Sequence, residues 1–158
     1  MSKETIRETI GVLGVVASLL FVGLEIRQST AVARGQTRQE LEAMNQDWLT
    51  LITADPYFGD LWYRAWITDG EVTPDEEYRA TMMMLQFMRR LENIYFQRAE
   101  GLVDETALRS YGLQDVATFF DRSRFQTWWV ERGRREAFHL EFVTFVEEQA
   151  TANRSGSR

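Results

Sequence analysis

A run of sixteen uncharged residues at positions 9–24 dominates the hydrophobic pattern of the chain. Ten of them are Ile, Val, Leu or Phe, and only glycine, alanine, serine and threonine interrupt the run. A helix over residues 9–24 would be about 24 Å long, and one over residues 6–26 about 31 Å, close to the roughly 30 Å hydrocarbon core of a bilayer. The pattern therefore predicts a transmembrane anchor in residues 1–26.

Two other interpretations of this segment stay open. A buried core helix usually carries a polar stripe every three or four residues, whereas this run is apolar on all sides. A cleaved signal peptide needs a small-residue site, and Ala31-Val32-Ala33 has that form. However, Glu25 and Arg27 stand between that site and the apolar run, which is unusual for a signal peptide.

Small residues recur on one face of the predicted anchor, at Gly11, Gly14 and Ser18. Gly14 and Ser18 are four residues apart, a spacing that lets a second transmembrane helix approach closely. We expect this face to be a candidate contact with a second copy of the chain or with another membrane protein.

Beyond the anchor, residues 27–40 are polar and predict a helix or linker beside the membrane. Over residues 41–150 apolar side chains recur at spacings of three and four, and no segment alternates with the period of two that a strand requires. Helix starts are indicated by four caps or capping boxes, at Asp55, Thr73, Asp104 and Ser123. The predicted fold class is all-α: a single N-terminal transmembrane helix, a bundle of about five further helices, and a disordered polar tail over residues 151–158.

The helix that starts at Thr73 is predicted to be the central, most buried one, yet its second half carries polar side chains. They are Arg89, Arg90, Glu92, Tyr95 and Gln97. A buried charge without a partner is costly, so these residues must pair or reach solvent. One interpretation is a structural Arg–Glu network. The other is a ligand pocket, in which an arginine binds an anionic group and Tyr95 supplies a hydroxyl.

The adjacent Trp128 and Trp129 raise a further question, because two neighbouring side chains cannot both face the core from one regular α-helix. We expect one of them at a rim, in contact with a partner or with lipid headgroups.

Composition excludes several classes of site. The chain of 158 residues has 24 acidic and 18 basic residues, no cysteine and one histidine. Its net charge of −6 disfavours general nucleic-acid binding, and the lack of cysteine excludes thiolate catalysis and iron–sulfur clusters. Glu136-x-x-His139 is half of a di-iron motif, but this chain has no second histidine to complete it. We expect no metal, no cofactor and no catalytic activity.

Several segments together resemble a group of small, uncharacterised bacterial proteins. The anchor and its end, residues 10–30, are similar to an apolar anchor that closes on a Q-I-R-Q-[NS]-T-like sequence, here with Glu25 in place of glutamine. The group also shares the segments around residues 92–97, 101–104 and 128–129.

The resemblance implies a single-span protein of the bacterial inner membrane with a helical body, and it supplies no activity. Within that frame we expect a non-catalytic module that binds protein partners or itself; the alternative is a small-molecule or lipid-binding bundle with its pocket on the central helix. We expect the body on the cytoplasmic side, because a short N-terminal leader is easily translocated and a cysteine-free body needs no oxidising compartment.

Overall fold

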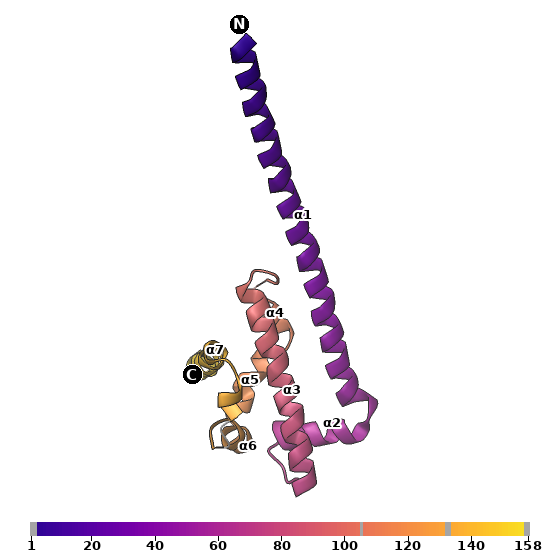
Figure 1. Cartoon of the computed structure of the whole chain (residues 1–158). Helices are drawn as coiled ribbons and strands as arrows, with labels where there is room; N and C mark the ends of the chain where they lie inside the picture. The colour runs from indigo at the N-terminus through magenta and orange to yellow at the C-terminus, as the bar shows by residue number, and fades with distance from the viewer. Residues whose placement is uncertain (1–2, 105, 132–133, 157–158) are drawn as a thin grey trace. The chain divides into compact units, whose positions relative to one another are not determined.

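Every regular element in the described part of the chain is helical. The computed structural model describes residues 3–104, 106–131 and 134–156. Its elements are α1 (Lys3–Ala54), α2 (Pro56–Trp62), the π-helical turn η1 (Tyr63–Ile67), α3 (Pro74–Ala99), α4 (Ala107–Ser110), α5 (Leu113–Phe119), α6 (Ser123–Gln126), the π-helical turn η2 (Thr127–Glu131), the 3-10 turn η3 (Arg134–Ala137) and α7 (Leu140–Gly156) (Figure 1). The predicted all-α fold class is confirmed.

The chain forms two compact units, residues 1–38 and residues 39–158, and we call the second unit the body. Helix α1 contributes residues to both units. The polar segment 27–40, for which both a helix and a linker were expected, is helical and forms part of α1.

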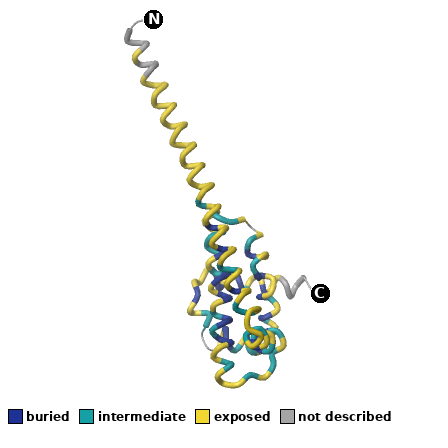
Figure 2. The backbone as a smooth tube through the Cα atoms, turned by 90° about the vertical axis from the view of Figure 1, so that its right-hand side faces the viewer, coloured by how far each residue is buried: buried dark blue, intermediate teal, exposed yellow. Residues whose placement is uncertain are grey.

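In the first unit, the apolar side chains of α1 are uncovered. Ten large apolar residues between Val12 and Ile26 keep 47–68% of their surface exposed (Figure 2). Among the described helices, α1 alone is long and apolar enough to cross a membrane. It is therefore a candidate membrane span, although a signal sequence or a core helix can have the same length and composition.

The centre of the body is α3, as predicted. Nine of its residues are buried: Ala80, Thr81, Met83, Met84, Phe87, Met88, Arg90, Leu91 and Ile94. The predicted capping box opens the helix, with the Glu76 N–H donating to Thr73 Oγ1 at 3.3 Å and the Thr73 N–H donating to Glu76 Oε2 at 2.8 Å. The helix stops before Gly101, whose φ of +72° is a conformation that glycine adopts readily.

The expectation that one of the paired tryptophans lies at a rim is wrong. Trp128 and Trp129 are 1% and 0% exposed, and both pack against Phe125, at ring-centre distances of 5.5 and 5.8 Å. They lie on η2, where the wider π-helical turn separates successive residues by about 82° instead of about 100°. Two adjacent side chains can then share one face.

Three further expectations need correction. The single helix expected after Asp104 is divided into two short helices, α4 and α5, because the chain between them turns at Gly112, whose φ is +109°. Ser123 forms no capping box; its hydroxyl bonds to Asp69 instead. Helix α7 continues to Gly156, so residues 151–156 of the expected tail are helical, while 157–158 lie outside the described residues.

Candidate functional site

The five polar residues predicted to form a pocket on α3 do not converge on one site. Successive residues of an α-helix point about 100° apart, so Arg89 and Arg90 leave the helix in different directions. Arg89 and Glu92 contact the segment that leads into α7, whereas Arg90 contacts α1 and the residue that follows α4. The structure therefore divides the predicted pocket between two sides of α3.

Arg89 and Glu92 bind the residues that lead directly into α7 and so fix the start of that helix. The Arg89 guanidinium donates to Glu92 Oε2 at 2.6 Å and to the Ala137 carbonyl at 2.6 Å, and it stacks over the Phe138 ring at 4.7 Å. The other oxygen of Glu92 accepts the His139 N–H at 2.7 Å. This is the structural Arg–Glu interpretation, and it occupies both charged groups.

Tyr95 and Gln97 lie further along α3, apart from the arginines. The Tyr95 ring packs against Phe142 and Phe145, with ring centres 5.8 and 4.9 Å away. Gln97 Oε1 is a buried oxygen that has no hydrogen-bond donor. No contact in the described residues joins either side chain to Arg90.

Arg90 is the exceptional residue of the predicted set, because it is a cation inside the core. Only 6% of its surface is exposed. One amine donates to Asn45 Oδ1 at 2.6 Å and the other to the Tyr111 carbonyl at 2.9 Å, but both of these acceptors are uncharged. Its Nε is buried without a partner, and no carboxylate of the described residues forms an ion pair with it.

A cleft of about 400 Å³ lies beside Arg90, within the body. Its walls come from the end of α1, from α2 and η1, from α3, and from the segment 110–119. Aromatic rings line much of it: Trp48, Trp62, Phe87, Tyr111 and Phe119. The guanidinium carbon of Arg90 lies 5.5 Å from the ring centre of Trp48 and 5.2 Å from that of Phe87, so the rings also cover the cation.

Asp115 lines the same cleft and supplies its acidic group. Removal of water lowers the pKa of Arg90 to about 10, against the opposing influence of Asp115 and Tyr111. It also raises the pKa of Asp115, against the opposing charge of Arg90. Arg90 is thus buried at this cleft and Asp115 is exposed beside it, and no ion pair between the two is present among the described residues.

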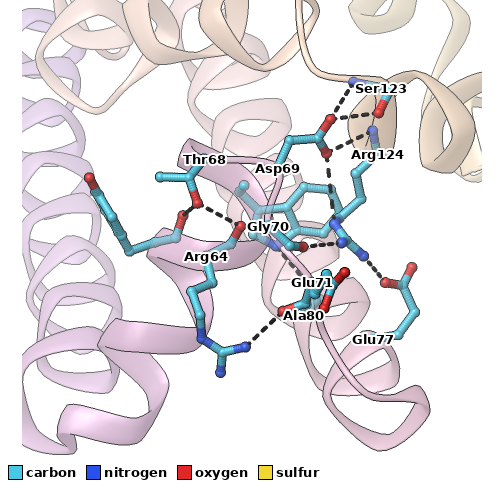
Figure 3. Close-up of polar contacts among 11 residues, drawn as sticks. Arg64, Thr68, Asp69, Gly70, Glu71, Glu77, Ala80, Ser123 and Arg124 are labelled. Atoms are coloured by element: carbon cyan, nitrogen blue, oxygen red, sulfur yellow. Dashed lines mark hydrogen bonds and ion pairs between the residues drawn. The ribbon is translucent and has the colours of Figure 1, made fainter.

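A second polar cluster, which the sequence analysis did not identify, joins the loop after η1 to α6 (Figure 3). Asp69 has a φ of +55° and accepts three hydrogen bonds, from the Ser123 N–H at 3.1 Å, the Ser123 hydroxyl at 2.5 Å and the Arg124 N–H at 3.1 Å. The Arg124 guanidinium donates to the Gly70 carbonyl at 2.5 Å and to the Glu77 carboxylate. Although burial acts to raise the pKa of Asp69, the bonds from Ser123 and Arg124 lower it below its usual value.

Beside this cluster, Arg64 binds three acceptors on different elements. It donates to Asp60 Oδ2 and Glu76 Oε1, both at 2.7 Å, and to the Glu71 carbonyl at 2.9 Å. The hydrogen bond from Arg64, with those from Thr73, lowers the pKa of Glu76 to about 2. Both clusters hold the two ends of the η1–α3 connection in place, and both are structural in character.

The sequence indicates the Asp69 cluster better than it indicates the cleft beside Arg90. Asp69-Gly70 is visible in the sequence as a helix stop, and an aspartate that tolerates positive φ there is a recognisable feature. Nothing local indicates that Asp115 and Trp48 share a cleft with Arg90. Among the described residues, no three His, Asp or Glu side chains are grouped as metal ligands, and His139 packs its ring against Phe96.

Comparison of the chain with protein-family models, with curated proteins and with solved structures gives no match.

Proposed function

We propose that the protein is a single-pass, membrane-anchored module of the bacterial inner membrane, whose helical body binds protein partners or a second copy of the chain without catalysis. The uncovered apolar surface of α1 carries this proposal. Each of the ten exposed side chains between Val12 and Ile26 favours insertion into lipid by about 0.3–0.6 kcal/mol. Together they contribute a few kcal/mol.

The helical geometry supports insertion in a second way. A spanning segment must satisfy every polar group internally. Ser18 is the one hydroxyl-bearing residue within 11–26, and it donates to the Gly14 carbonyl at 2.9 Å. Residues 11–26 can therefore enter lipid without an unpaired side-chain hydroxyl.

Fractionation of cells that produce the full chain tests the anchor. We expect the natural chain to pellet with membranes and to stay there after an alkaline carbonate wash. Leu19→Arg places a charge near the middle of the span, at a cost of about 3 kcal/mol, and should move a large part of the protein out of the membrane fraction. Val32→Arg, at a similarly exposed position outside the span, is the matched control and should remain in the membrane.

Two results would contradict the anchor: recovery of the natural chain in the aqueous fraction without detergent, or an N-terminus that begins directly after Ala33. The second result would identify a cleaved signal peptide.

We further propose that the body lies in the cytoplasm. A reporter that fluoresces only in the cytoplasm, fused to the C-terminus, should be bright. A dark cytoplasmic reporter together with an active periplasmic one would reverse the orientation.

A further inference from the structure

The cleft beside Arg90 contains two opposite charges that do not meet. Arg90 and Asp115 both line it, and neither forms an ion pair with the other or with another described residue. Arg90 is 6% exposed, and its Nε has no hydrogen-bond partner. A protein rarely keeps a buried cation and a nearby carboxylate apart, because each would be stabilised by an opposite charge.

One part of the cleft wall is aromatic and suited to an apolar group, whereas Asn45, Ser110 and Gln114 make another part polar. Trp48, Trp62 and Phe87 form one continuous ring cluster, with ring-centre distances of 4.9 Å between the two tryptophans and 5.7 and 5.6 Å from them to Phe87. Phe119 extends this cluster at 5.8 Å from Trp62. The volume of about 400 Å³ is within the range of sites for small molecules, about 300–1,000 Å³.

The charges restrict the ligand. A phosphate dianion would be repelled by Asp115, and a simple organic cation would be repelled by Arg90. A molecule with one carboxylate and one ammonium group would complement both side chains and leave the site neutral.

We propose that this cleft binds a small zwitterion of the apolar α-amino acid class, with its carboxylate on Arg90, its ammonium group toward Asp115 and its side chain against the rings of Trp48 and Trp62. The site belongs to the body alone and does not depend on membrane anchoring.

Isothermal titration of the full chain in lipid nanodiscs tests the charge requirement. Four probes share a phenyl ring: L-phenylalanine has both charges, phenylacetate only the carboxylate, phenethylammonium only the ammonium group, and phenylacetamide neither. We expect L-phenylalanine to bind at least tenfold more tightly than each of the others. Equal or tighter binding of a singly charged or neutral probe, or no binding of L-phenylalanine, would overturn the proposal.

Substitutions then test whether Arg90 binds the carboxylate of the ligand and Asp115 its ammonium group. Arg90→Gln should weaken L-phenylalanine at least tenfold and leave phenethylammonium no weaker. Asp115→Asn should weaken L-phenylalanine and leave phenylacetate no weaker. Arg89→Gln, on the other side of α3, is the control and should bind all four probes as the natural chain does.

A uniform loss of all probes in Arg90→Gln would mean that Arg90 only holds the fold, and it would overturn the assignment. If that variant fails to fold, Asp115→Asn and the four-probe comparison on the natural chain decide the question, because neither requires the buried arginine to be changed.

Discussion

Glu76 connects two roles in one side chain, since it closes the capping box of α3 with one oxygen and binds Arg64 with the other. Its pKa of about 2 in the folded state lies below the ordinary value of 4.5. A carboxylate with a lowered pKa stabilises the fold fully above its unfolded value, and this contribution is lost as the pH falls toward the folded value. The stabilisation should therefore disappear under acidic conditions.

We predict that Glu76→Gln lowers the free energy of unfolding at neutral pH, and that its difference from the natural chain shrinks as the pH falls from about 5 toward about 2. Urea unfolding at a series of pH values measures this. Glu148→Gln, at an exposed position on α7, is the control and should differ little from the natural chain throughout. A Glu76→Gln difference that is independent of pH would contradict the ion-pair assignment.

At the scale of elements, the π-helical turn η2 places two adjacent tryptophan side chains in the core. Trp128 and Trp129 are both enclosed, and the Trp129 indole also donates to Glu147 Oε1 at 3.0 Å on α7. The neighbouring Val130 is 58% exposed. The turn thus directs two consecutive side chains inward and the third outward.

We predict that Trp128→Ala and Trp129→Ala each destabilise the body by about 3–5 kcal/mol, because each leaves a large cavity. Val130→Ala should cost less than about 0.5 kcal/mol. Thermal unfolding followed by circular dichroism compares the three variants. If one tryptophan variant were as mild as Val130→Ala, the segment would be a regular α-helix with one ring at the surface.

Features whose partners lie nearby in the sequence could be predicted, and features whose partners lie far away in the sequence could not. The caps at Asp55 and Thr73 were identified because their hydrogen-bond partners lie two or three residues away. The partners of Arg90 lie 45 and 21 residues away, and no local pattern relates them. The sequence marked Arg90 as a charge that needed an explanation, but it could not reveal that Arg89 and Arg90 serve different sides of α3. Likewise, the rim prediction for the tryptophans assumed regular α-helical geometry, which η2 does not have.

At the scale of the whole molecule, the small-residue face of the predicted anchor indicates that the chain associates with itself. Beyond the backbone of the helix itself, no atom of the described residues lies within 4 Å of where a side chain would begin at Gly11 or Gly14, so the helix face with Ser18 is open to a second helix. We expect the chain to form dimers in lipid through this face.

Energy transfer between donor- and acceptor-labelled copies in vesicles measures that association. Gly14→Leu and Ser18→Leu should each reduce the transfer severalfold, whereas Val16→Leu, on the opposite side of the helix, should leave it nearly unchanged. Equal transfer in all variants would exclude this face, and transfer no greater than random mixing in the natural chain would exclude a dimer under these conditions.

The distribution of indole rings gives the molecule a built-in optical property. All five tryptophans, and all five tyrosines, lie in the body, and residues 1–38 contain neither. Tryptophan and tyrosine emission therefore originates in the body alone, and four of its five indoles are buried. Loss of body structure should shift that tryptophan emission to longer wavelength, and the apolar end of α1 adds no indole signal, so a sample needs no attached dye to report on the folding of the body.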